Sequence, residues 1–264
     1  MIQDERLDFL IEAFKAESEE YKKICVPAER DGKRQFLRVL MNVRMPGPMS
    51  AEVLAVQDAY LRERAEEKGI VGLDEIPVIC DGLSIWQGDI TRLAVDAIVN
   101  AANSAMLGCF VPGHNCIDNC IQTYAGVQMR AECDRQMRLM KEKFGRNYVQ
   151  PTSIPMLTEG YNLPAKKVVH IVGPIVTGAL TEKDEKALAD CYTNTLDLCM
   201  REGFKSLAFC CISTGVFHFP NEEAAEIAVN TVRGWQETHG NAMERIIFNV
   251  FKDEDKKYYE TLMR

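Results

Sequence analysis

The sequence predicts an α/β fold, in which a mostly parallel sheet is covered by helices on both faces and preceded by a helical extension. Two observations support this prediction. Before residue 80 the apolar residues follow helical spacing only, whereas from residue 80 onward short apolar runs alternate with helical stretches. Strands that alternate with helices are typical of a parallel sheet between two helical layers. We therefore expect a helical N-terminal extension over residues 1–80 and an α/β domain over residues 81–264.

The composition narrows the classes of protein to which the chain can belong. Its 264 residues carry a net charge of −8, and this acidic balance argues against a nucleic-acid-binding surface. We find neither a basic start followed by an apolar stretch nor an apolar run of about 18 residues, so we expect no signal peptide, no membrane contact and a cytoplasmic location. Ten cysteines in such a chain indicate core thiols, a metal site or both.

The extension is expected to contain three helices. The first is indicated by apolar residues that recur at helical spacing, namely Leu7, Leu10, Ile11 and Phe14. A second helix is expected over Lys33–Val43, and the segment Met45–Pro48 breaks the pattern after it. Ser50 is a typical N-cap for a third helix that runs through about Glu67. Because this part carries no chemical motif, it is either a structural appendage or a cap that shapes access to a site.

The α/β domain is expected to contain six strands and four helices. The strands are Leu83–Trp86, Ala97–Asn100, Ser153–Leu157, Lys167–Val172, Ser206–Ile212 and Arg245–Phe251. The helices are Cys116–Tyr124 with a continuation toward Met140, Glu185–Arg201, Glu222–Glu237 and Glu254–Met263. Ligands of such folds bind beyond the carboxyl ends of the strands. Candidate functional residues are therefore those that directly follow strands.

Polar residues follow the first two strands. Asp89 comes after the first strand, where its carboxylate either accepts a hydrogen bond from an exocyclic amine such as that of adenine or caps a turn. Asn100 and Asn103 stand at the end of the second strand. Because an amide both donates and accepts hydrogen bonds, both are candidate ligand-binding residues, although asparagine also favours turns.

The most distinctive segment places Cys109, His114 and Cys116 within eight residues of a loop. Thiolate and imidazole are preferred zinc ligands, and three protein ligands leave a fourth position open, as in catalytic zinc sites. The alternative is a buried histidine with two core thiols. On the following helix Cys120 falls on the apolar face and is interpreted as a core residue. Asp118, in the first turn, is either favoured there by the helix dipole or placed to act as a general base.

Two further motifs follow the last strands. The segment Ser213–Phe217 lies between a strand and a helix, where its backbone N–H groups are suited to cradle an anion. It matches neither the Walker pattern nor the dinucleotide glycine pattern. Phe251, at the end of the last strand, either stacks on a base or packs in the core.

In their order and positions these motifs resemble those of macrodomains. The resemblance is carried by Gly88–Thr91, Val99–Asn103, Ser213–Phe217, Glu159–Ala165 and His170–Pro174. It covers residues 83–264 and implies a three-layer α/β/α macrodomain with a pocket for ADP-ribose. The implied ligand-binding residues are Asp89 and Phe251 at adenine, Ile90 at the phosphates, Asn103 at the distal ribose, and Ser213, Thr214, Gly215, Val216 and Phe217 around the diphosphate.

The segment Gly108–Asn119 and the helical extension are similar to the zinc-containing branch of macrodomains. Ordinary macrodomains, outside this branch, carry a glycine-rich loop at this place instead. This resemblance implies that Cys109, His114 and Cys116 hold zinc beside the distal ribose. It also implies hydrolysis of mono-ADP-ribose from modified protein side chains at a glycosidic or ester linkage. Asn103 would then orient the ribose and Asp118 would handle a proton. Some bacterial members accompany a sirtuin-type ADP-ribosyltransferase, which makes such an enzyme a candidate partner.

Three other hypotheses stay open on the sequence. The chain is a non-catalytic reader of ADP-ribose, or it hydrolyses free derivatives such as O-acetyl-ADP-ribose, or its zinc is structural. Metal content separates the reader from the enzyme, since a pure reader needs no metal. Comparison of product release from protein and free substrates tests the second hypothesis, and the effect of chelation on the melting temperature tests the third.

Overall fold

The computed structural model describes residues 1–264, apart from the side chain of residue 241. Its six strands are β1 (Leu83–Gln87), β2 (Ala97–Ala101), β3 (Met156–Glu159), β4 (Lys167–Ile171), β5 (Ser206–Phe209) and β6 (Arg245–Val250). They form one sheet in the order β1-β6-β5-β2-β4-β3. Every neighbouring pair is parallel except β3 with β4, which is antiparallel. The predicted mixed, mostly parallel sheet is therefore confirmed.

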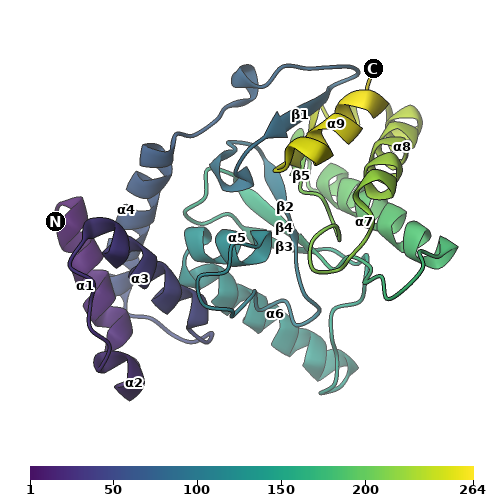
Figure 1. The fold of residues 1–264 in the computed structure, drawn as a ribbon. Helices are drawn as coiled ribbons and strands as arrows, with labels where there is room; N and C mark the ends of the chain where they lie inside the picture. Colours follow the sequence, from purple (N-terminus) through teal and green to yellow (C-terminus); the bar gives the residue numbers. More distant parts are fainter.

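Helices cover both faces of this sheet (Figure 1). One layer consists of α5 (Ile117–Ala125) and α6 (Val127–Phe144), and the other of α7 (Glu182–Arg201), α8 (Asn221–His239) and α9 (Asp253–Leu262). All four residues of β5 are buried, as are the first four of β2. Strands that are buried on both faces consist of nearly continuous apolar residues. This explains why β2 and β5 could be predicted from short apolar runs in the sequence.

The first 68 residues form the expected helical extension, which Figure 1 shows at one end of the molecule beside α5. Its helices are α1 (Gln3–Lys15), α2 (Glu19–Lys22), α3 (Arg30–Val43) and α4 (Ala51–Lys68). The predicted apolar face of α1 is buried against Leu37 and Leu40 of α3 and against Tyr60 of α4. Ser50 caps α4 as predicted, because its Oγ accepts a hydrogen bond from the amide of Val53 at 3.2 Å. The short α2 was not predicted.

Polar contacts tie α4 to the α/β part. The Oε1 of Gln57 accepts a hydrogen bond from the amide of Val127 at 3.1 Å, and Val127 also joins the apolar core of the extension. The carboxylate of Asp58 accepts hydrogen bonds from Gln128 at 2.8 Å and Asn162 at 2.7 Å. Between α4 and β1 the chain passes through the 3₁₀ helix η1 (Leu73–Glu75). The domain boundary at residue 80 stays a prediction.

Several predicted bounds differ from those observed. Helices α3 and α7 each begin three residues earlier than predicted, and β5 ends at Phe209 instead of Ile212. The third strand begins at Met156 instead of Ser153, because Ser153 has a left-handed φ of 64° and Pro155 has no amide for a ladder. The long helix after Cys116 is divided into α5 and α6 at Gly126, whose φ is 102°. A Cβ at Gly126 would also lie only 2.7 Å from Gln57 Nε2, so the break brings the chain close to α4.

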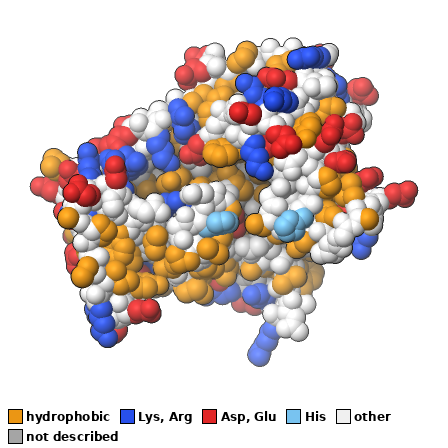
Figure 2. Space-filling view, viewed as in Figure 1, with side chains coloured by type: hydrophobic (Ala, Val, Ile, Leu, Met, Phe, Trp, Pro, Cys, Tyr) orange, Lys and Arg blue, Asp and Glu red, His pale blue; other side chains and the backbone are white. Residues whose placement is uncertain are grey.

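The face drawn in Figure 2 exposes hydrophobic side chains as well as charged ones. Figure 2 shows acidic and basic side chains interspersed across the face drawn. A search of the described residues finds no helix whose length and apolar character suit a membrane crossing.

Candidate functional site

A cavity of about 570 Å³ lies at the carboxyl ends of β1, β2, β5 and β6. This edge is where ligands of parallel α/β sheets bind, and the volume suits a small organic ligand. Eight of the residues predicted to bind the ligand line it, namely Asp89, Ile90, Ser213, Thr214, Gly215, Val216, Phe217 and Phe251. The structure thus brings together motifs that are more than 160 positions apart in the chain.

Three residues of α5 line the same cavity without having been predicted to do so, namely Ile117, Cys120 and Tyr124. Cys120 is half-buried and lies in the wall, so its interpretation as a core residue was wrong. Tyr124 lies one turn further along α5, and the ammonium group of Lys68 is 3.2 Å from the centre of its ring. The sequence placed Cys120 on the apolar face of the helix, and this face is turned partly toward the cavity.

Asp89 lines the cavity directly after β1, and its carboxylate forms local hydrogen bonds. Its Oδ1 accepts hydrogen bonds from the amide of Thr91 at 3.0 Å and the hydroxyl of Thr91 at 2.6 Å, and so caps the 3₁₀ helix η2 (Ile90–Arg92). Its Oδ2 lies 3.6 Å from the Nζ of Lys68. The half-exposed Asp89 therefore combines an acceptor at the cavity wall with a local structural role.

The loop Ser213–Phe217 lines the cavity and packs next to Gly173. Ser213 is buried and has a left-handed φ of 66°. A Cβ on Gly173 would lie only 2.0 Å from the Oγ of Ser213, so a glycine there allows the loop its close approach. The backbone amides of Gly215 and Val216 donate no hydrogen bond to the described residues. Free amides in such a turn are suited to bind phosphate oxygens.

Phe251 lies at the rim of the cavity directly after β6. Its side chain is 79% exposed, so it does not pack in the core. Beside it, the side-chain amide of Asn249 donates to the carbonyls of Trp86 at 3.2 Å and Gly88 at 3.0 Å. These bonds fix the ends of β1 and β6, and an exposed ring held there is suited to stack on a planar ligand.

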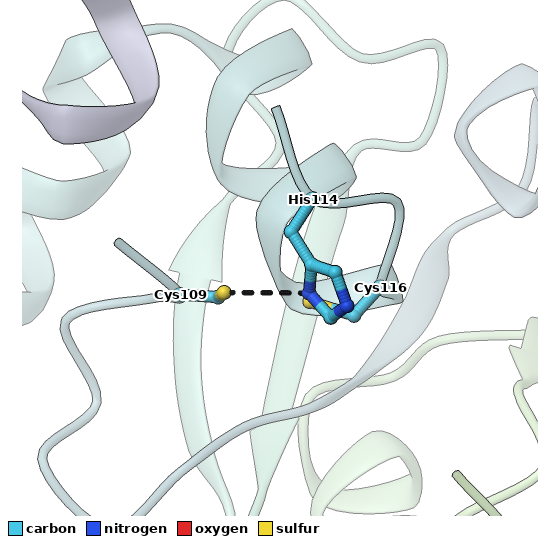
Figure 3. Close-up of side chains that lie close together, drawn as sticks. All are labelled: Cys109, His114 and Cys116. Carbon is cyan, nitrogen blue, oxygen red and sulfur yellow. Dashed lines mark hydrogen bonds between the residues drawn. The ribbon is translucent and has the colours of Figure 1, made fainter. Parts of the chain in front are cut away.

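Cys109, His114 and Cys116 converge at one point, as Figure 3 shows. Their ligand atoms all lie within 4.8 Å of one another, and Cys109 Sγ is 3.6 Å from His114 Nδ1. Tetrahedral zinc bonds sulfur at about 2.3 Å and nitrogen at about 2.0 Å, which places the two ligand atoms about 3.5 Å apart, close to the observed separation. The donor set therefore fits a zinc ion in both chemistry and spacing.

The surroundings of Cys116 are consistent with metal binding. This residue is the N-cap of α5, and its Sγ accepts a hydrogen bond from the amide of Asn119 at 3.4 Å. Burial, and to a smaller degree the neighbouring Cys109, raises the pKa of the Cys116 thiol to about 12. The Cys116 thiol therefore keeps its proton near pH 7 when no cation is bound, and a metal ion would displace that proton on binding.

The residues Asn100, Asn103 and Asp118 contact one another instead of lining the cavity. Asn100 Nδ2 donates to Asp118 Oδ1 at 2.8 Å, and Asn103 Nδ2 lies 3.3 Å from Asp118 Oδ2. Asn100 is fully buried and Asp118 is 5% exposed, whereas Asn103 is half-buried. Burial raises the pKa of Asp118 to about 6, although the hydrogen bond from Asn100 and the charge of Arg130 oppose the rise. Asn100 does not line the cavity in this arrangement, and its role in ligand binding stays a prediction.

The buried network continues to His170, which the sequence did not single out as a polar centre. The Nδ1 of His170 is 3.0 Å from Asn100 Nδ2, and its Nε2 is 2.9 Å from Thr158 Oγ1. Because Asn100 Nδ2 is a donor, Nδ1 accepts and the proton is assigned to Nε2. Burial lowers the pKa of His170 to about 3, so the ring is neutral near pH 7.

Comparison with known proteins identifies the family. Residues 99–228 match the Macro domain family. The chain is 48% identical to a protein-ADP-ribose hydrolase of Treponema medium over the full length of both chains. It is 43% identical to a protein-ADP-ribose hydrolase of Staphylococcus aureus, over 97% of this chain and 94% of the relative. A probable bifunctional ADP-ribose hydrolase/ADP-ribosyltransferase of Fusarium oxysporum is 38% identical over 92% of this chain and 43% of its own length.

Solved structures agree with this assignment. A Trypanosoma brucei macrodomain in complex with ADP-ribose superposes with a TM-score of 0.65 at 27% identity, over 83% of this chain and 92% of that one. An Oceanobacillus iheyensis macrodomain with ADP gives a TM-score of 0.61 at 32% identity, over 71% of this chain and 93% of that one. The three-layer fold, the matched segment and the full-length relatives lead to one conclusion. The chain belongs to the macro domain family, and its full-length curated relatives described above bear the name protein-ADP-ribose hydrolase.

Proposed function

We propose that this protein hydrolyses mono-ADP-ribose from modified protein side chains at a site that holds zinc. One observation carries the proposal above the others. Asn115 and Ile117, which flank Cys116 in the chain, both line the nucleotide-sized cavity. The Cys109–His114–Cys116 cluster therefore adjoins the wall of this cavity, and the Trypanosoma brucei macrodomain that shares the fold was solved in complex with ADP-ribose.

The donor set favours a catalytic over a purely structural ion. Three protein ligands converge, and His114 is exposed while both cysteines are half-buried. A fourth position is then available to water or substrate, as in catalytic zinc sites. Zinc bound there would supply a Lewis acid, or a water whose pKa is lowered to about 7.

The cavity residues are proposed to bind the nucleotide along its length. Asp89 accepts a hydrogen bond from the adenine amine, and Phe251 stacks near the same ring. Ile90, by its backbone, and the Ser213–Phe217 loop hold the diphosphate, since the loop presents unpaired amides at the cavity. This orientation directs the distal ribose toward the remaining wall, where Asn115 and Ile117 lie.

Asn103 and Asp118 are proposed to act together at the distal ribose. Asn103 is the half-buried member of the pair, so it is the one placed to orient the sugar. The buried carboxylate of Asp118 holds the amide of Asn103 and that of Asn100. These contacts favour a positioning role for Asp118, and its role as a proton acceptor stays a prediction.

The proposal is tested by release of ADP-ribose from a protein that carries it on an acidic side chain, with and without a zinc chelator. Release that the chelator stops and added zinc restores is expected. Release at an unchanged rate in the presence of the chelator would refute the role of zinc. Binding of ADP-ribose without release would identify a reader, and release only from O-acetyl-ADP-ribose would identify an enzyme of free derivatives.

The melting temperature, recorded in the same samples, separates a catalytic from a structural ion. If the ion is catalytic, we expect chelation to abolish activity with little change in melting temperature. A fall in melting temperature that accompanies the loss of activity would show that the ion is structural. The pairing with a sirtuin-type transferase stays a prediction. The bifunctional hydrolase/ADP-ribosyltransferase name of the Fusarium oxysporum relative is consistent with a partner of that general activity.

A further inference from the structure

We propose that helix α3 of the N-terminal extension positions the segment 108–116, here called the ligand loop, and thereby sets the metal affinity of the site. Arg38 and Asn42 are the positioning residues. This inference rests on the metal site proposed above. It assigns to the helical extension a function at the site itself, more than 65 positions away in the chain.

Asn42 joins the two halves of the ligand loop. Its Nδ2 donates to the carbonyl of Cys109 at 2.5 Å, and its Oδ1 accepts from the amide of Gly113 at 3.2 Å. One planar amide thus holds the backbone of the first metal ligand and the backbone next to the second. The side chain of Asn42 is fully buried at the end of α3, so its end of each hydrogen bond is shielded from water.

Arg38 holds the part of the loop around His114. Its Nη2 donates to the carbonyl of His114 at 2.6 Å, and its Nη1 donates to Asn115 Oδ1 at 2.8 Å. Nη2 also reaches Asn119 Oδ1 at 3.3 Å on α5. The planar guanidinium carries several donors in fixed directions, so it restrains the loop and α5 at once.

Asn119 completes the frame from the other side of the loop. Its Nδ2 donates to the carbonyls of Cys109 at 3.3 Å and Val111 at 3.1 Å, while its Oδ1 accepts from Arg38. The side chain is fully buried. The loop backbone is therefore held between two helices that belong to different parts of the chain.

The face of α3 that carries these residues is distinct from the face that packs on α1 and α4. Gln35, Arg38, Val39 and Asn42 follow the spacing i, i+3, i+4, i+7, whereas Leu37, Leu40 and Met41 belong to the core of the extension. At Gly113, which has a φ of 66°, a Cβ would lie 3.0 Å from Gln35 Nε2 and 3.5 Å from Val39 Cγ2. The loop therefore lies directly on this face of the helix.

A further contact fixes the end of α3 itself. Arg130 of α6 donates to the carbonyls of Asn42 at 2.8 Å and Arg44 at 2.5 Å. Its guanidinium also lies 4.3 Å from the ring centre of Phe110, which is part of the ligand loop. The end of α3 and the loop thus share one cationic neighbour.

The energetic consequence is preorganisation. Without these bonds the loop would have to order its backbone when it binds a metal ion, and that entropy would be subtracted from the binding free energy. Groups that orient metal ligands typically change metal affinity by about 10–100-fold when they are removed. We expect a loss in this range for Arg38→Ala and for Asn42→Ala.

The test measures the zinc Kd of the full chain by competition with a chromophoric chelator, together with the visible absorption spectrum of the cobalt-loaded protein. Arg38→Lys keeps the positive charge but loses the planar guanidinium with its several donors. We expect its zinc Kd to lie between those of wild type and Arg38→Ala. Asp58→Ala is the matched control, because Asp58 joins the extension to α6 and Asn162 but does not contact the ligand loop. Amide hydrogen exchange of residues 108–116 in metal-free protein gives a readout that needs no metal.

Weaker zinc binding and faster loop exchange in the Arg38 and Asn42 variants, with both near wild type in Asp58→Ala, would support the inference. Unchanged zinc Kd and unchanged exchange in folded Arg38→Ala and Asn42→Ala would overturn it, as would an equal loss in all three variants. A wild-type chain that binds no zinc would refute the proposed metal site. In that case loop exchange alone would decide whether α3 holds the loop.

Discussion

The side-chain amide of Asn103 lies between the buried carboxylate of Asp118, at 3.3 Å, and the carbonyl of Gly108, at 3.0 Å. Asn103 therefore links Asp118 to Gly108, the first residue of the ligand loop. In Asp118→Asn one carboxylate oxygen becomes an NH₂ group, which donates hydrogen bonds and accepts none. The side chain can then no longer accept from both Asn100 and Asn103 through separate oxygens. Loss of such a bond costs about 1–3 kcal/mol, so we expect kcat to fall by about 10–100-fold with little change in KM.

Steady-state release of ADP-ribose from modified protein measures both constants. A rise in KM at constant kcat would show that Asp118 acts in binding instead of positioning. A wild-type kcat would show that the network around Asn103 has no part in turnover. The ADP-ribose Kd of the variant, measured in parallel, should stay within about 3-fold of wild type because Asp118 does not line the cavity.

His114→Ala removes one of the three proposed metal ligands from an exposed position. We expect the zinc bound per chain to fall and turnover to be lost, while ADP-ribose still binds, because His114 is not part of the cavity wall. Metal analysis, calorimetric binding of ADP-ribose and release assays measure the three properties. Cys25→Ser, which removes an exposed thiol of the extension, serves as the control and should keep its zinc. Turnover retained by His114→Ala would exclude a catalytic ion at this cluster.

Gly173→Ala tests whether the Ser213–Phe217 loop binds the nucleotide. The added Cβ would meet the Oγ of Ser213 at 2.0 Å, so the loop must shift. Overpacking of this kind costs about 1–3 kcal/mol, and we expect ADP-ribose affinity to fall by about 10-fold or more while zinc binding is kept. Gly234→Ala is the control, because a Cβ there meets nothing within 4 Å and should stabilise α8 slightly. Wild-type affinity in Gly173→Ala would separate this loop from nucleotide binding.

His170 gives the stability a specific pH dependence. Its pKa is lowered by burial to about 3, whereas an unfolded histidine titrates near 6.5. Between these values the unfolded state binds the extra proton, so stability falls as the pH is lowered from 6.5 toward 3. From pH 7 to pH 5 this one group removes about 2 kcal/mol of unfolding free energy.

The measurement is denaturant unfolding of metal-free wild type and His170→Gln at pH 7 and pH 5. The variant breaks hydrogen bonds and should be less stable at pH 7, but its loss of stability on acidification should be smaller by about 2 kcal/mol. Parallel pH dependences in the two proteins would show that His170 is not buried in its neutral form.

Much of the fold was predictable because apolar runs and helical stripes report burial directly. β5 is buried along its whole length and was found by its apolar residues alone. The start of β3 was misplaced because the backbone of Ser153 is left-handed, which hydrophobicity does not report. The break at Gly126 was missed for a related reason, since an isolated glycine in a helical pattern is tolerated at a cost of about 1 kcal/mol.

The candidate site was predictable where residues directly follow strands, because topology brings those ends together. Asp89 and the Ser213–Phe217 loop were found in this way and line one cavity. Arg38, Asn42 and His170 were missed, because each has an ordinary place in a helix or strand and forms a hydrogen bond with a residue about 65–80 positions away. Only the tertiary structure brings such partners together.

All three proposed metal ligands come from one stretch of eight residues, so the ion would bridge no distant parts of the chain. Neither apolar core contains any of them. An empty site would therefore leave a folded protein that still accepts nucleotide and can be loaded again. If the proposed zinc is catalytic, loss of the ion would stop turnover and rebinding of zinc would restore it.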